Sequence, residues 1–236
     1  MKKVMTAVVG AALLLGACSV RSISNSGYGG ESGTTNAFYR GELKEADVIG
    51  VPPDTPVTEA EIAAALKGGG QALPQPRRSL PLMVVQSGAV VPDDLMLQAL
   101  RRGFTVESFS GVPPANTDDY ARRLRLMAAQ GGYRQLLCYW GALEAERSGS
   151  ATKLVSWVPI VGAIIPDERQ RMRLRLKALL VDVETGRWRA YAPAPVDDTA
   201  ISTPLTREDS DQDQVAQLKA KAYEALADDL IRAAVP

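Results

Sequence analysis

The absence of histidine limits the chemistry that this chain can perform. Its 236 residues include two cysteines, 27 lysines and arginines and 27 aspartates and glutamates, but no histidine. Without an imidazole there is no Ser-His or Cys-His nucleophile pair. Zinc-protease helices and most transition-metal sites are excluded in the same way. The sequence therefore predicts neither a metal site nor a cofactor.

Carboxylates remain as candidates for acid-base catalysis, but their spacing argues against it. Asp93-Asp94 and Asp118-Asp119 each stand where an amphipathic helix is expected to begin, a place where negative charge is favourable. A hydrolase would need a serine–lysine or carboxylate pair converging in a cleft, and no spacing predicts one. We therefore expect a protein that is not an enzyme.

Cys138 is predicted to be a small buried side chain. It lies in the apolar run Leu136–Trp140, and free cysteine behaves as a small hydrophobic residue in such surroundings. The alternative is a reactive thiol.

Cys18 ends a segment with the layout of a secretory signal. Lys2 and Lys3 give a positive start, and an apolar stretch with small residues runs up to Ala17. The stretch is shorter than the roughly 20 residues that a membrane-spanning helix needs.

The four residues Leu15 to Cys18 (Leu-Gly-Ala-Cys) resemble the lipobox of bacterial lipoproteins at every position. The resemblance implies that residues 1–17 are a signal peptide and that Cys18 becomes the lipidated first residue, with a thioether-linked diacylglycerol and an N-acyl chain such as palmitate. Two or more acyl chains anchor a protein stably, at about 0.8 kcal/mol per buried methylene. Ser19 stands where an aspartate would retain enterobacterial lipoproteins, so we expect export to the outer membrane, with the protein facing the periplasm and membrane lipid as the partner of Cys18.

Residues 18–80 are expected to form a flexible tether. Ser, Gly, Asn and Thr dominate residues 19–37. Thr58 and Glu61 have the spacing of a capping box, which predicts a short helix near residues 58–67. This helix would be a lid on the domain or a partner-binding peptide. A tether of about 60 residues would have a typical reach of about 40–50 Å.

Residues 81–236 are expected to form one α/β (α+β) domain. Buried strands at 82–85, 104–109 and 133–140 alternate with helices that begin near Pro92 and Thr117, which predicts a parallel β-α-β-α-β first half of a mixed sheet.

The second half of the domain is expected to be an antiparallel long-strand hairpin followed by a C-terminal helix. Residues 170–183 alternate strictly between apolar and mostly basic side chains, so one face should be buried and the other wet. A turn with Gly186 should follow. A further strand could come from residues 142–157. The last helix, starting at Ser210, carries an apolar stripe that should pack on the sheet.

The order of elements, together with the run from Lys177 to Trp188, resembles a superfamily of bacterial lipoproteins. It includes the curli secretion lipoprotein, the lipoprotein activators of penicillin-binding proteins and the amino-terminal domain of TolB. The similarity covers roughly residues 80–233 and rests on a long strand that ends in a Val-Asp-Val-x-Thr-Gly hairpin. It implies a small α/β domain that binds proteins or oligomerises at the outer membrane.

An uncharged run between Lys153 and Asp167 is the first candidate interaction site. Pro159 and Gly162 disfavour a long helix. The run could be a loop over its own core, an exposed patch for a partner or for self-assembly, or a lipid contact with an interfacial tryptophan. The candidate patch consists of Trp157, Val158, Pro159, Ile160, Ile164 and Ile165.

A basic row is the second candidate. Its side chains would project from one face of the long strand about 7 Å apart. They could pair across strands with Glu144 and Glu146, or dock to anionic lipid headgroups or an acidic partner. The row consists of Arg171, Arg173, Arg175 and Lys177.

The sequence as a whole predicts a lipid-anchored protein of the cell envelope whose domain is a protein-binding or assembly module. Its partner would be a periplasmic or outer-membrane protein, or a second copy of the chain. The formal net charge is +0, so there is no electrostatic basis for nucleic acid as a partner. A subunit of an oligomeric secretion or transport assembly is the alternative. An envelope hydrolase is disfavoured because histidine is absent.

Overall fold

The architecture was analysed in a computed structural model. It describes residues 18–26, 36, 39–50, 56–68, 73–116, 119–149, 168–202 and 207–236.

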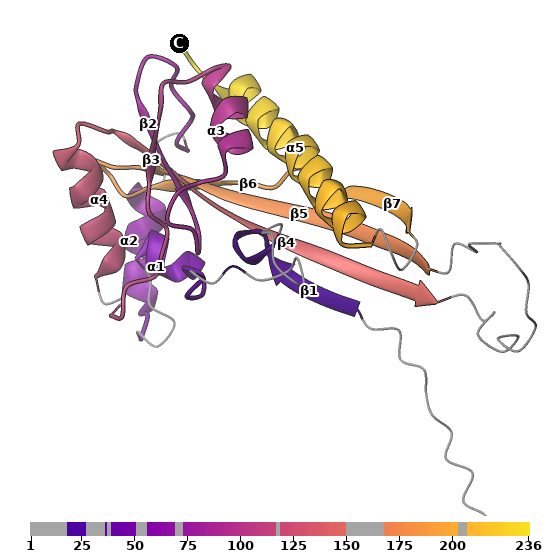
Figure 1. Cartoon of the computed structure of the whole chain (residues 1–236). Coiled ribbons are helices and arrows are strands. Elements are labelled where there is room, and N and C mark those ends of the chain that lie inside the picture. Colours follow the sequence, from indigo (N-terminus) through magenta and orange to yellow (C-terminus); the bar gives the residue numbers. More distant parts are fainter. Residues whose placement is uncertain are drawn as a thin grey trace, which may run out of the picture.

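The described strands form one mixed sheet of seven, in the order β3-β2-β4-β5-β6, with β1 paired to β4 and β7 paired to β5 (Figure 1). The two central strands, β4 and β5, have 15 residues each, which is about 50 Å at ~3.4 Å per residue. Each is therefore long enough to pair with two shorter strands in succession. The strands are β1 (Cys18–Ser22), β2 (Leu82–Gln86), β3 (Val106–Phe109), β4 (Gln135–Gly149), β5 (Glu168–Asp182), β6 (Trp188–Tyr191) and β7 (Val196–Ser202).

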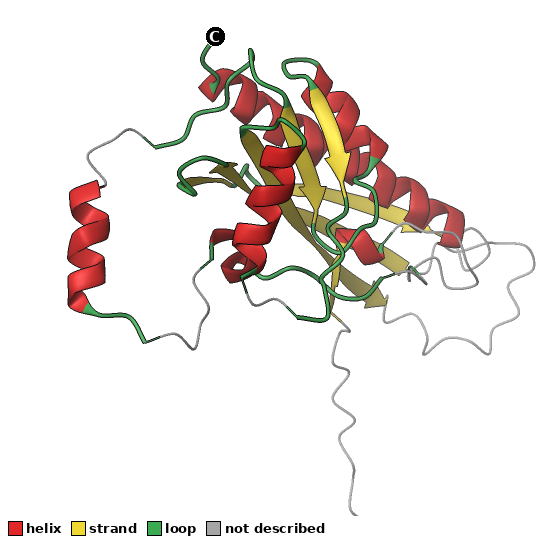
Figure 2. Cartoon of the chain, turned by 90° about the vertical axis from the view of Figure 1, so that its left-hand side faces the viewer, coloured by secondary structure: helices red, strands yellow, loops and turns green. Residues whose placement is uncertain are grey.

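Helices cover both faces of the sheet (Figures 1 and 2). α5 packs on one face against α3, β5 and β7, whereas α1 and α4 contact each other on the opposite face. The predicted C-terminal helix on the sheet is thus confirmed, although it begins before Ser210. The helices are η1 (a 3-10 turn, Ile23–Asn25), α1 (Glu45–Ile49), α2 (Glu59–Gly68), α3 (Asp94–Arg101), α4 (Tyr120–Gln130) and α5 (Arg207–Ala233).

The parallel half of the sheet agrees with the prediction. β2 pairs in parallel with both β3 and β4, and α3 and α4 are the crossover connections. All five residues of β2 are buried, because helices cover both of its faces. α4 differs from the prediction at its start: it begins at Tyr120, after Asp119 at a φ of 55°. Thr117, its predicted cap, lies outside the described residues.

The antiparallel half is a hairpin of the two long strands. β4 continues the predicted strand at 133–140 into the region beyond residue 142, pairing with β5 along its whole length. Met172, Leu174 and Leu176 are buried between β5 and α5, while Arg171 is exposed on the other face. The α/β fold class with a parallel first half and an antiparallel long-strand hairpin is therefore confirmed.

The predicted turn after β5 is held by Asp182. Its Oδ1 accepts hydrogen bonds from the Thr185 backbone N–H at 2.8 Å and the Thr185 hydroxyl at 2.7 Å. Gly186 follows at a φ of 72°, in the left-handed region that favours glycine. The Asp-x-x-Thr-Gly part of the motif thus supplies the bonds and the backbone freedom that the turn needs.

α2 forms as expected, but its apolar side chains are more exposed than those of a helix packed on the domain as a lid. The Thr58–Glu61 capping box is present, with the Thr58 N–H donating to Glu61 Oε2 at 2.8 Å and the Glu61 N–H donating to Thr58 Oγ1 at 3.3 Å. Ile62 and Leu66 are 46% and 74% exposed. Figure 2 shows α2 standing apart from the sheet. Among the described helices, none is both long and apolar enough to cross a membrane.

Candidate anchoring site

Cys18 is the first residue of β1, at the far end of the long hairpin. β1 runs antiparallel to β4, with Cys18 opposite Glu146 and Ser22 opposite Ala142. Glu146 is close to the last residue of β4, Gly149, which pairs with the first residue of β5. The predicted lipidation site is therefore the start of a sheet strand.

Ile23 fixes the chain immediately after β1. It is 1% exposed and belongs to the core between the sheet and α5. A Cβ atom on Gly141 would lie 2.6 Å from Ile23 Cγ2, a distance that real contacts do not show. A glycine in β4 thus leaves the space that the Ile23 side chain fills.

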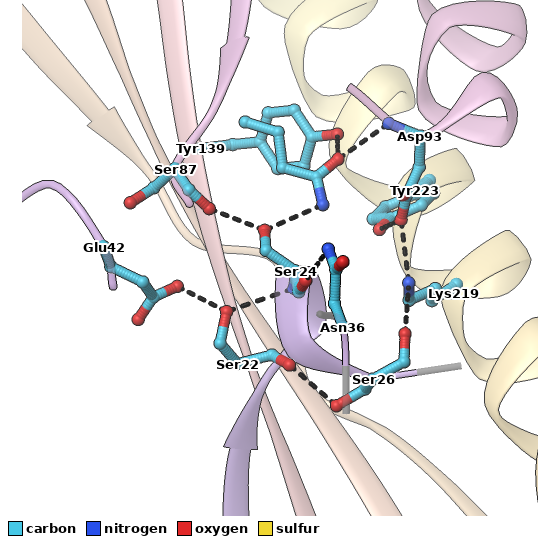
Figure 3. A network of polar contacts seen from close by, with 11 residues as sticks. Ser22, Ser24, Ser26, Asn36, Glu42, Ser87, Asp93, Tyr139, Lys219 and Tyr223 are labelled. Atoms are coloured by element: carbon cyan, nitrogen blue, oxygen red, sulfur yellow. Dashed lines mark hydrogen bonds and ion pairs between the residues drawn. The ribbon is translucent and has the colours of Figure 1, made fainter. Parts of the chain in front are cut away.

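Three serines, the last residue of β1 and two residues that follow it, enter a network of polar contacts (Figure 3). The hydroxyl of Ser24 donates to the Ser87 carbonyl at 2.6 Å and accepts from Gln86 Nε2 at 2.9 Å. Ser22 Oγ donates to Glu42 Oε1 at 2.7 Å, and Ser26 Oγ donates to the Ser22 carbonyl at 2.7 Å. Buried hydroxyls need such partners, because an unpaired polar group loses its bonds to water.

Gln86 connects this network to the first parallel strands. Its Oε1 accepts from the Tyr139 hydroxyl at 2.6 Å and from the Asp93 backbone N–H at 2.7 Å. Both ends of the Gln86 amide are therefore bonded, and the side chain joins β2, β4 and the start of α3 to Ser24.

Lys219 and Asp93 form an ion pair at the other end of the network. Lys219 Nζ lies 2.9 Å from Asp93 Oδ2, and the two side chains are 10% and 17% exposed. The Tyr223 hydroxyl also donates to Asp93 Oδ2, and Lys219 Nζ donates to the Ser26 carbonyl at 3.2 Å. α5 therefore holds both the start of α3 and the segment after Cys18.

The structure brings a serine and a lysine together that the sequence did not place side by side. Lys219, however, contacts the carbonyl oxygen of Ser26, while the Ser26 hydroxyl donates to Ser22. Lys219 Nζ is engaged by the Ser26 carbonyl oxygen and by Asp93 Oδ2, so the contacts of the lysine hold the chain in place. The chemistry of this pair favours positioning over nucleophilic catalysis.

A second N-terminal segment, residues 39–50, covers the opposite face of β4. The Leu43 N–H donates to Ser87 Oγ at 2.8 Å, and Trp140 Nε1 donates to the Leu43 carbonyl at 2.6 Å. Burial raises the pKa of the Glu42 carboxyl, and the hydrogen bond from Ser22 opposes this rise. Residues 18–26 and 39–50 thus belong to the fold, and the prediction of a flexible tether over residues 18–80 is wrong for them.

The basic row lies on the face of the hairpin away from α5, and three of its four members form ion pairs with carboxylates. Arg173 Nε lies 2.6 Å from Asp197 Oδ1, Arg175 Nε lies 2.7 Å from Glu144 Oε1 and Lys177 Nζ lies 2.6 Å from Glu45 Oε1. The hydrogen bond from Arg173 lowers the pKa of the Asp197 carboxyl. The predicted cross-strand pairing with Glu144 is confirmed, while Arg171 lies opposite Glu146 in register.

The remaining candidates give different outcomes. The patch of Trp157, Val158, Pro159, Ile160, Ile164 and Ile165 lies outside the described residues. Cys138 is 0% exposed, and burial raises the pKa of its thiol well above the ordinary value, which confirms the small buried side chain. Among the residues that the structure describes, no three Cys, Asp or Glu side chains are placed to hold a metal ion.

The network could not be recognised from the sequence. Ser22, Ser24 and Ser26 lie in a stretch with the composition of a linker, in which Val20 and Ile23 are the large apolar residues between positions 18 and 26. On α5, a lysine and a tyrosine four residues apart fall on the apolar stripe that faces the sheet. These two polar residues at buried helix positions were the available signal.

Comparisons with known proteins identify a family and similar structures. The model of the YafT bacterial lipoprotein family matches residues 44–233. No curated protein matches the sequence. The chain is similar to the PelC dodecamer from Paraburkholderia phytofirmans, with 15% identity over 66% of this chain and 94% of that chain and a TM-score of 0.31. It is also similar to a putative neuraminyllactose-binding hemagglutinin homolog from Helicobacter pylori, with 9% identity over 69% of this chain and 89% of that chain and a TM-score of 0.30. At these TM-scores the structural similarity carries no argument about function.

Proposed function

The chain belongs to the YafT bacterial lipoprotein family, and we propose that it is an outer-membrane lipoprotein whose periplasmic domain binds a protein partner or assembles with itself. Membership of this family implies attachment to a membrane of the cell envelope. The lipidation site, the choice of membrane and the binding role belong to the proposal.

The observation that carries the proposal is the position of Cys18. The lipobox ends at this residue, and the chain enters the sheet at the same residue as β1. The resemblance to the lipobox implies a diacylglycerol on the Cys18 sulfur and an N-acyl chain on its amino group. Ser19 in the following position supports export to the outer membrane.

A binding role fits the chemistry of the domain better than catalysis. The buried polar side chains of the network bond one another and the N-terminal segment, which leaves them occupied in positioning. The similarity to the superfamily of the curli secretion lipoprotein, the penicillin-binding-protein activators and TolB is part of the same proposal. It is supported by the long hairpin and by the turn that Asp182 and Gly186 stabilise.

Metabolic labelling with an alkyne analogue of palmitate tests the anchor. We expect the wild-type protein to be labelled and to sediment with outer-membrane markers. Cys18→Ser should lose the label and leave the membrane fraction, whereas the matched control Cys138→Ser should keep both. A Cys18→Ser protein that remains labelled would refute lipidation at this residue, and sedimentation with the inner membrane would refute the outer-membrane assignment.

Photo-crosslinking in living cells tests the binding role. A photoreactive residue replaces Trp157 in the candidate patch, and a second one replaces Leu126, which is 58% exposed on α4, as the control. A discrete adduct with another protein from position 157 alone supports a binding module, and a ladder of self-adducts supports assembly. Equal patterns from both positions, or no adduct, would contradict a role for this patch.

A further inference from the structure

Four strands begin or end at the same end of the sheet, as seen along the strand direction. β1 begins there at Cys18, β4 ends at Gly149, β5 begins at Glu168 and β7 ends at Ser202. The register places Gly149 opposite Glu168 and Glu168 opposite Ser202, with Cys18 opposite Glu146 beside them. We call this the distal edge; Figure 1 shows it at the opposite end of the molecule from the C-terminus.

No flexible linker separates Cys18 from the folded domain. β1 is extended and paired from its first residue, and the next residue, Ile23, is buried in the core. Ser24 and Ser26 are then tied to Ser87 and Lys219. A group attached to Cys18 is therefore attached to the sheet itself.

We infer that the lipid on Cys18 holds the distal edge against the bilayer in a fixed orientation. The inference rests on the proposed lipidation. Along the strand direction, Gly149 lies beyond Glu146 and hence beyond the level of Cys18 by about 10 Å, at ~3.4 Å per residue. The headgroup region on each side of a bilayer is only about 5–8 Å thick. With acyl chains inserted at Cys18, the ends of β4 and β5 reach the headgroups.

An exposed basic side chain at the level of Cys18 suits the headgroup region of the bilayer. Arg171, which is exposed, lies on the strand pair level with Cys18, and an arginine at this depth can contact lipid phosphates. The end of the molecule with the β5–β6 turn then faces away from the membrane, where Glu184 is exposed.

Fluorescence quenching by a lipid-headgroup quencher tests the orientation in vesicles that carry the purified lipidated protein. One fluorophore is attached at Arg171→Cys and, in a second protein, at Glu184→Cys. These positions are about 40 Å apart, since the length of β5 separates them. Labelling is selective because Cys18 carries lipid and Cys138 is buried. We expect most of the emission to be lost at position 171 and little at position 184.

Equal quenching at the two positions would overturn the inference, because it would mean a freely tumbling domain or one that lies flat on the membrane. Flotation of the vesicles separates this failure from failure of the anchor, since a protein without lipid does not float with them. A variant with Ile23→Ser and Ser24→Ala should float normally but lose the difference between the positions. The comparison of positions 171 and 184 without these two substitutions tests the orientation even if this variant fails to fold.

Discussion

Lys219 and Asp93 place opposite charges where water is scarce. Removing an ion from water is costly, and the cost is offset only where the partner and further hydrogen bonds are well placed. Tyr223 and the Ser26 carbonyl supply those bonds here. The loss of either partner would leave a charge with little solvation.

We expect Lys219→Met to lower the free energy of unfolding by about 3 kcal/mol, because Asp93, whose side chain is only 17% exposed, would lose its cation. Urea denaturation measures this. The matched control is Arg102→Met, which breaks the ion pair with Asp228, where the side chains are 47% and 54% exposed; exposed pairs contribute about 0–1 kcal/mol. Equal losses in the two variants would contradict the structural role of the buried pair.

Glu42 gives stability a dependence on pH. Burial raises the pKa of its carboxyl in the folded state above the ordinary value of 4.5. Between pH 4.5 and the raised pKa, the folded state binds more protons than the unfolded state. The free energy of unfolding therefore falls as pH rises through this range. Glu42→Gln removes the charge and keeps an acceptor for Ser22.

Glu42→Gln should therefore unfold at a higher urea concentration than the wild type at pH 7. The difference should shrink as pH falls through the raised pKa, and it should be least below 4.5, where the wild-type carboxyl is protonated in both states. Urea midpoints at several pH values measure it. A difference that stays constant with pH would show that titration of Glu42 is not its cause.

At the scale of elements, β5 has two faces with different tasks. The apolar face packs against α5, and the charged face pairs with β4, β7 and α1. β7 was not predicted, because Pro193 and Pro195 precede it and Asp197 and Asp198 favour strands poorly. Its pairing with β5, together with the Arg173–Asp197 ion pair, stabilises it as a strand.

Arg173→Glu should lower the melting temperature slightly, since it places a carboxylate opposite Asp197 and beside Glu144. The charge reversal Asp197→Arg should restore most of the loss when it is combined with Arg173→Glu. Thermal unfolding of the two single variants and the double variant measures the coupling. Additive effects would mean that the pair contributes nothing to holding β7.

At the scale of the whole molecule, the segment after Cys18 is a structural part of the domain. β1 covers the outer edge of β4, Ile23 fills a place in the core, and the serines complete the polar network. The proposed lipidation site therefore lies at one end of a hairpin about 50 Å long. An interaction surface at the opposite end would be held well away from the bilayer.

A chain that begins at residue 27 should have a lower free energy of unfolding than one that begins at Cys18. The difference should be about 2–5 kcal/mol or more, because the shorter chain lacks one buried isoleucine. Urea denaturation of the two unlipidated proteins compares them. Leu66→Ala on the exposed helix α2 serves as the control and should change stability by less than about 0.5 kcal/mol. Equal stability of the long and short chains would support the flexible tether instead.

The sequence alone determined the features that depend on local patterns. Strict alternation along residues 170–183 predicted the long strand and its two faces, since side chains on a strand alternate with a period of two. The capping box predicted α2, and the Thr-Gly motif predicted the turn after β5. The apolar runs at residues 82–85 and 133–140 predicted the buried parallel strands.

Only the tertiary structure decided how the N-terminal segment is used. Residues 18–26 have the composition of a linker, because four of the nine are serine and one is asparagine, a residue depleted in strands. They become a strand and a buried turn because β4 offers an open edge, Gly141 leaves room for Ile23 and Gln86, Ser87 and Lys219 offer hydrogen-bond partners. These partners are far apart in the sequence, and only the fold brings them together.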